Sequence, residues 1–143
     1  AALRAARMLV AEDEVRDGLI GLVLIDPVDG GGRRPSTRTS TAWCTPLRLP
    51  TTVVGAGHGG VCAPEPVNHP AFADAVPDAR HVVVEGMGHG DLLDGRERAL
   101  GRRLCGGADD PDPCRGLVAH LLLTALDGGD PADVDDPLLR VVR

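Results

Sequence analysis

Large aromatic side chains are almost absent from this 143-residue chain, which has no tyrosine and contains only Trp43 and Phe72 as aromatic residues. A core must therefore be built from valine, leucine, isoleucine and alanine, without the large area that aromatic side chains bury. Such a core is thin for a free-standing domain, although 43% of the residues are hydrophobic and the length suits one domain. We therefore expect the chain to be part of a larger folded unit.

Clustered basic residues and long apolar runs are also lacking. Lys and Arg number 15 against 21 Asp and Glu, which gives a formal net charge of −6, whereas nucleic-acid binding relies on clustered Lys and Arg. No apolar run approaches the roughly 18 residues needed to cross a bilayer, and the first residues do not resemble a signal peptide. These features predict a soluble protein with no nucleic-acid partner and no transmembrane segment.

The cysteines and histidines lack the spacing of a metal site. There is no His-x-His or His-Glu-x-x-His pair, and the cysteines lack the paired short spacings of a zinc site, so we expect no metal and assign no cofactor. A local bridge between Cys105 and Cys114 is conceivable, but buried free thiols are favoured in an intracellular protein. The cysteines are Cys44, Cys62, Cys105 and Cys114, and the histidines are His58, His69, His81, His89 and His120.

What the chain does contain is two apolar runs that end near a polar residue among turn formers. The first, residues 19–25, ends at Asp26, and the second, residues 82–84, is soon followed by His89 between two glycines. An acid after one buried strand and a histidine after a later one are the last two members of the Ser, Asp or Glu, His triad of α/β-hydrolases. We therefore predict Asp26 as the acid and His89 as the base. The serine that should precede them is not found.

Other acidic residues near these positions are alternatives. Asp29 lies three residues beyond Asp26 and is the rival acid, but Asp26 is favoured because it directly follows the strand, where parallel sheets place active-site groups. Asp91 and Asp94 are interpreted as helix-start carboxylates without chemistry.

The remaining pattern predicts an α/β fold with three parallel strands and flanking helices, the C-terminal part of an α/β-hydrolase. The first strand has the apolar pattern of a strand buried on both faces, so we expect earlier strands to pair with its free edge. We expect one domain over residues 1–127 and a polar, then extended, tail over residues 128–143. The expected elements are a helix already under way at residue 1, strands at residues 19–25, 51–55 and 81–84, a long loop at 30–50, and helices at 68–76, 91–104 and 112–127.

Three motifs in order resemble the chlorophyllase family over about residues 1–127. They are Leu24-Ile25-Asp26-Pro27-Val28-Asp29-Gly30, then Cys62-Ala63-Pro64 with Val67-Asn68-His69 and Phe72, then Gly88-His89 with Asp91-Leu92-Leu93-Asp94. The resemblance implies an α/β-hydrolase that cleaves the phytyl ester of chlorophyll with a Ser, Asp, His triad and no cofactor. It also implies a chloroplast location, and it places the acid on Asp26 and the base on His89.

Departures from the family pattern accompany this resemblance. The family's serine lies in a Gly-His-Ser-Arg-Gly-Gly elbow that would fall just before Ala1, so we expect the nucleophile and the oxyanion-hole donors on a missing N-terminal half, together with any targeting peptide. These residues alone would then be inactive. Met87 and Gly90 stand where the family usually has a tyrosine and a larger apolar residue. The open alternatives are a general lipase or carboxylesterase of the same fold, or a non-catalytic fragment that binds pigment or a partner.

Overall fold

The computed structural model describes residues 21–28, 49–64, 67–76 and 78–143. The expected opening helix and nearly all of the expected loop at residues 30–50 lie outside these ranges. The described elements, with η for 3-10 helices, are β1 (Leu22–Ile25), β2 (Thr51–His58), α3 (His69–Ala75), β3 (Arg80–Gly88), η3 (His89–Leu92), α4 (Glu97–Cys105), α5 (Pro111–Leu126), η4 (Pro131–Asp133) and β4 (Leu139–Val141).

β1, β2 and β3 form the three parallel strands that the sequence predicts. Leu24 lies beside Val53 in the first pair, and Val54 lies beside Val82 in the second. The strands follow one another in the sheet order β1, β2, β3, β4, so β1 is at one edge of the described sheet. Because the three strands are parallel, their carboxyl ends meet at one rim of the sheet, which is where α/β proteins place ligands.

The fourth strand comes from the C-terminal tail. β4 pairs antiparallel with β3, so that Val83 lies beside Arg140, and Leu138 and Leu139 pack against the buried core. Before this strand, η4 buries Pro131. Among the described residues the sheet therefore has four strands where the sequence predicts three, because a short apolar stretch of the tail pairs with the outer edge of β3 and covers it.

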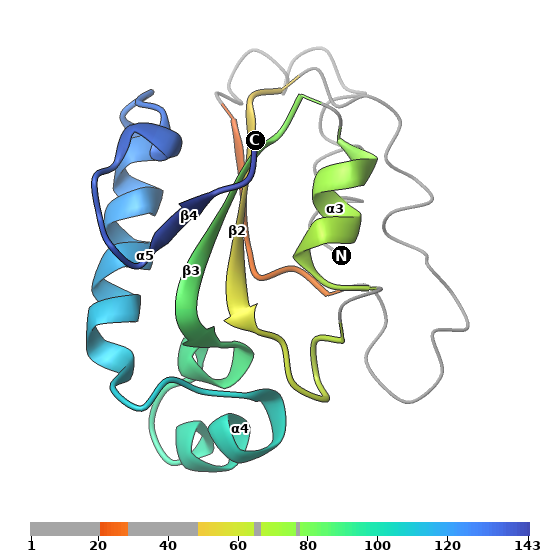
Figure 1. Cartoon of the computed structure of the whole chain (residues 1–143), viewed down its shortest axis with the longest axis vertical. Coiled ribbons are helices and arrows are strands. Elements are labelled where there is room, and N and C mark those ends of the chain that lie inside the picture. The colour runs from red at the N-terminus through yellow and green to blue at the C-terminus, as the bar shows by residue number, and fades with distance from the viewer. Residues whose placement is uncertain (1–20, 29–48, 65–66, 77) are drawn as a thin grey trace, which may run out of the picture.

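Helices cover both faces of the sheet, as Figure 1 shows. On one face, Leu117 and Leu121 of α5 pack in the core cluster that contains Val84 of β3. On the opposite face, α3 contributes Phe72, which is 4% exposed and packs with Val53 of β2. The central strands are thus buried on both sides, which explains why they read as continuous apolar runs.

Helix boundaries follow local signals in two cases and depart from the prediction in a third. Asn68 is the N-cap position of α3, with Pro70 in the first turn. The carboxylate of Asp110 caps α5 by accepting a hydrogen bond from the N–H of Asp112. The single helix predicted over residues 91–104 is instead split into η3 and α4, because Gly95 between them has a φ of +61°, which no right-handed helix contains.

A disulfide joins Cys62 to Cys105, 43 residues later in the chain. The expectation of free thiols is therefore wrong for these two residues, and the conceivable local bridge to Cys114 is not formed. Cys114 is free and buried, as expected, and Cys44 lies outside the described residues. Next to the bridge, the backbone N–H of Val61 donates to the carbonyl of Leu104 at 3.4 Å. Only the fold brings the loop after β2 and the end of α4 together.

Candidate active site

Asp26 follows β1 directly, and its carboxylate is buried at the carboxyl rim of the sheet. The residue is 2% exposed, and its φ of +38° is unusual for a residue other than glycine. Its backbone N–H donates to the carbonyl of Val54 at 2.6 Å, and its Oδ1 accepts from the N–H of Ala56 at 3.0 Å. Two hydrogen bonds to β2 therefore hold a strained residue in place, and backbone strain of this kind clusters at functional sites.

His89 is the first residue of η3 and comes directly after β3. Its Nδ1 lies 2.7 Å from Oδ2 of Asp26, a contact between residues 63 positions apart. Because a carboxylate only accepts, Nδ1 is assigned as the donor, which leaves the lone pair of the neutral ring on Nε2. The structure thus brings together the two residues that the sequence selects.

The pair combines a buried acid with a base that solvent reaches. The Asp26 side chain is 0% exposed, whereas that of His89 is 31% exposed. Within the part of the chain that the structure describes, Nε2 of His89 makes no hydrogen bond, so it is available as an acceptor there. An imidazole oriented in this way can take a proton from a hydroxyl, and the carboxylate then stabilises the imidazolium.

The rival acid, Asp29, lies outside the described residues. Asp26 is the acid that contacts His89, and the catalytic roles of Asp26 and His89 remain a prediction.

The two departures from the family pattern have local explanations. Met87 is fully buried in the core beneath α5. At Gly90, a Cβ would lie 2.4 Å from the backbone nitrogen of Arg102, so the close approach of α4 leaves no room for a larger residue.

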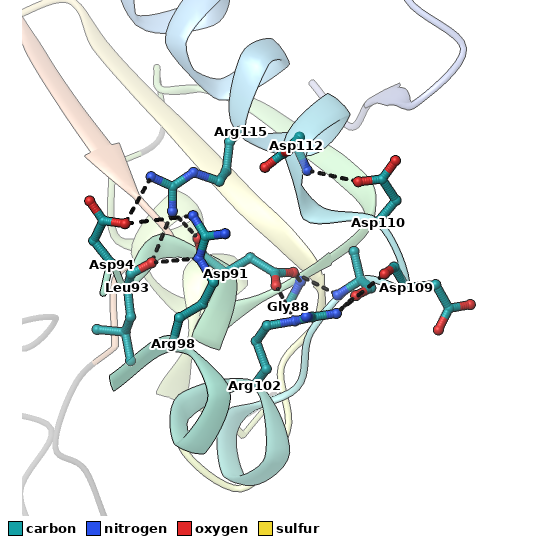
Figure 2. Close-up of polar contacts among 11 residues, drawn as sticks. Gly88, Asp91, Leu93, Asp94, Arg98, Arg102, Asp109, Asp110, Asp112 and Arg115 are labelled. Carbon is teal, nitrogen blue, oxygen red and sulfur yellow. Dashed lines mark hydrogen bonds and ion pairs between the residues drawn. The ribbon is translucent and has the colours of Figure 1, made fainter. Parts of the chain in front are cut away.

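Asp91 is a helix-start carboxylate, as the sequence predicts, because it is the N3 residue of η3 and its side chain bonds the N-cap residue Gly88. Sequence reasoning missed its complete burial, since the residue is 0% exposed. Its Oδ2 accepts hydrogen bonds from the N–H groups of Gly88 at 2.9 Å and Ala108 at 2.7 Å. Its Oδ1 lies 3.0 Å from Nε of Arg102, a close ion pair without hydrogen-bond alignment. Figure 2 shows this cluster at the start of η3.

A pair of histidines, which sequence reasoning also missed, is connected to Asp26 through the backbone of Ala56. Nδ1 of His69 lies 2.8 Å from Nε2 of His81, and Nε2 of His69 lies 3.2 Å from the carbonyl of Ala56. Burial, together with the nearby His69, Arg143 and Arg140, lowers the pKa of His81 to about 4. His81 is therefore neutral at ordinary pH.

Metal-binding clusters and membrane-spanning helices are both lacking in the described ranges. No group of three or more His, Cys, Asp or Glu side chains there could hold a metal ion. No helix among those residues is long and apolar enough to cross a bilayer.

Comparison with known proteins identifies the family. The model of the Chlorophyllase family matches residues 5–128, which is most of the chain. No curated protein matches the chain. The matched range contains all three motifs on which the resemblance depends, as well as Asp26 and His89. Membership of this family indicates an ester hydrolase of the chlorophyllase type. The chain belongs to the Chlorophyllase family.

Proposed function

We propose that this chain forms the acid and base part of an α/β-hydrolase that cleaves the phytyl ester of chlorophyll to chlorophyllide and phytol. Asp26 is the triad acid and His89 is the general base. The single observation that carries the proposal is the 2.7 Å contact between Nδ1 of His89 and Oδ2 of Asp26 at the carboxyl rim of a parallel sheet. Through its family the protein is proposed to act in the chloroplast, without a cofactor.

The two residues would share the proton transfers of acyl transfer. A serine hydroxyl gives its proton to Nε2 of His89 as its oxygen attacks the ester carbonyl. The resulting tetrahedral intermediate collapses, and the imidazolium returns the proton to the departing alkoxide, so that phytol leaves. Water then repeats the sequence on the acyl-enzyme and releases the acid. Asp26 accepts the hydrogen bond from Nδ1 throughout and stabilises the imidazolium.

The nucleophile of this scheme is not assigned to a serine of this sequence. Ser36 and Ser40 are the two serines, and neither stands in a Gly-x-Ser-x-Gly context, which the nucleophile elbow requires. We propose instead that the serine lies in the family's elbow, on a segment that precedes residue 1. The reaction must then be assayed with the protein expressed from its whole reading frame.

The test of this function is the rate of chlorophyllide release by that protein. His89→Ala should lower kcat by about 10⁶-fold and Asp26→Asn by about 10⁴-fold, with little change in KM. His120→Ala is the matched control, because His120 is exposed on α5 and its loss should leave the rate unchanged. A His89→Ala protein with the wild-type rate would remove this residue from the mechanism.

The substrate is tested by a second comparison in the same assay. A chlorophyllase should prefer the long isoprenoid ester to p-nitrophenyl butyrate, whereas a general carboxylesterase should prefer the short ester. Equal loss of both activities in His89→Ala would show that one site performs both reactions. Preference for the short ester would overturn the chlorophyll assignment and leave the acid and base roles standing.

A further inference from the structure

We propose that Asp91 is a positioning residue that fixes the turn carrying His89 and so keeps the imidazole on Asp26. This inference rests on the proposed function of the Asp26–His89 pair. Asp91 lies two residues after His89 in η3, and its carboxylate is fully buried. The geometry points to a role that acts through His89 rather than through contact with substrate.

The carboxylate of Asp91 links the backbone just before His89 to the loop that follows α4. One oxygen, Oδ2, accepts from the N–H of Gly88, the residue just before His89, and from the N–H of Ala108 in the loop after α4. A separate backbone bond joins the N–H of Gly90 to the carbonyl of Gly106 at 3.0 Å. The residues on both sides of His89 are therefore bonded, directly or through Asp91, to the loop that follows α4.

Close packing makes this arrangement sensitive to displacement. A Cβ at Gly88 would lie 2.1 Å from the carbonyl carbon of Gly106, and one at Gly90 would lie 2.4 Å from the backbone nitrogen of Arg102. The backbone around His89 thus lies directly against α4 and its following loop. If the bonds to Asp91 are weakened, these segments separate and the histidine moves with them.

Three cationic side chains around η3 support the same placement, as Figure 2 shows. Arg102 Nε lies 3.0 Å from the free oxygen of Asp91, and the same guanidinium donates to the carbonyl of Ala108. Arg115, from α5, donates to the backbone carbonyls of Asp91 and Leu93 at 3.0 and 2.9 Å. Arg98, from α4, also donates to the carbonyl of Leu93, at 3.3 Å. The turn is therefore held from α4, α5 and the intervening loop.

The negative charge of Asp91 is needed to hold the turn, because its two carboxylate oxygens have different partners. Oδ2 accepts two N–H bonds, and Oδ1 lies beside the cation of Arg102. The oxygen of an amide could still accept the two N–H bonds, but its NH₂ group would then lie against Arg102. Asp91→Asn should consequently loosen the turn with little change in side-chain volume. A displacement of about 1 Å at a catalytic group can cost about 100-fold in rate.

The experiment uses the protein expressed from its whole reading frame, with ¹⁵N-labelled histidine, and reads the tautomer of His89 by NMR. In the wild type the proton should reside on Nδ1. In Asp91→Asn the His89 ring should lose this fixed tautomer while the protein stays folded, and kcat should fall by about 100-fold with KM within about twofold. Glu97→Gln is the matched control, because Glu97 lies in the first turn of α4 and is exposed; its histidine signals should match the wild type.

The results for these variants either support or overturn the positioning role of Asp91. An unchanged His89 tautomer and an unchanged kcat in folded Asp91→Asn would overturn the proposal and leave Asp91 a structural residue. If Asp91→Asn does not fold, Arg102→Gln replaces it. That variant removes the cation and should shift the same signals in the same direction, and unchanged signals there would overturn the proposal. Failure of the proposed function is distinguishable, because it would appear as a wild-type rate of chlorophyllide release in His89→Ala, whatever the tautomer of His89 in Asp91→Asn.

Discussion

His81 donates its Nε2 proton to Nδ1 of His69 across 2.8 Å, in a site where both rings are buried between α3 and the sheet. The direction follows from the other end of His69, whose Nε2 must donate to the carbonyl of Ala56. Ala56 in turn donates its N–H to Asp26. The histidine pair is therefore connected through one residue, Ala56, to the acid of the candidate active site.

The histidine pair predicts a loss of stability in acid. In the folded protein the pKa of His81 is lowered to about 4 from its ordinary 6.5, so between these pH values only the unfolded chain binds the extra proton. The stability that depends on neutral His81 is complete above pH 6.5 and is lost as the pH falls to about 4. The loss should amount to about 3 kcal/mol.

Urea unfolding at a series of pH values measures this effect. His81→Gln, which can still donate to His69 but does not titrate, should show a flatter dependence than the wild type between pH 4 and 6.5. His120→Gln is the control, because His120 is exposed on α5, and it should keep the wild-type profile. Parallel profiles for the wild type and His81→Gln would contradict the assignment.

The Cys62–Cys105 disulfide predicts a stability that depends on redox state. The bridge closes a loop with a sequence separation of 43, and the entropy of closing a loop of that size in the unfolded chain corresponds to about 4 kcal/mol. Replacing both cysteines with serine should lower the free energy of unfolding by about that amount. Dithiothreitol should destabilise the wild type to a similar extent and should not affect the double variant. A wild type that dithiothreitol does not destabilise would argue against the bridge.

Two leucines on α5 test the position of the core. Leu121 is 0% exposed and Leu123 is 59% exposed, although they are two residues apart on one helix. Leu121→Ala should lower the free energy of unfolding by about 3 kcal/mol, because it leaves a cavity beneath the sheet. Leu123→Ala should change it by less than about 0.5 kcal/mol. Equal losses of unfolding free energy in the two variants would mean that the wrong face of α5 has been assigned to the core.

Two glycines test the close approach around the candidate active site. A Cβ at Gly88 would meet backbone atoms of Gly106 and Gly107 at 2.1 to 2.3 Å, whereas Gly116 in α5 has nothing within 4 Å. Gly116→Ala should therefore stabilise the helix by about 0.5 to 1 kcal/mol, while Gly88→Ala should destabilise the protein by at least about 1 kcal/mol. Thermal unfolding of both variants measures the contrast. A neutral Gly88→Ala would show that the loop after α4 is not packed on β3.

The sequence locates Asp26 and His89 because their signals are local. A continuous apolar run predicts a buried strand, and parallel strands bring their ends to one rim, so the meeting of the two residues follows from the pattern. Asp91 gives no such signal, because one of its backbone donors belongs to Ala108, 17 residues away, and reaches it only after α4 folds back.

The disulfide and the fourth strand could not be predicted for a similar physical reason. Cys62 and Cys105 have no short spacing, and only the docking of α4 beside the loop after β2 brings them together. The three residues of β4 are too short for a periodic pattern to be read. Its pairing depends on the open edge that β3 offers.

The most direct test of the acid and base assignment is covalent labelling with a fluorophosphonate, which reacts with a serine only when a neighbouring base activates it. The protein expressed from its whole reading frame should be labelled at one serine in a Gly-x-Ser-x-Gly elbow. Labelling should be lost in His89→Ala, strongly slowed in Asp26→Asn and unchanged in His120→Ala. Labelling that persists at the wild-type rate in His89→Ala would contradict the assignment.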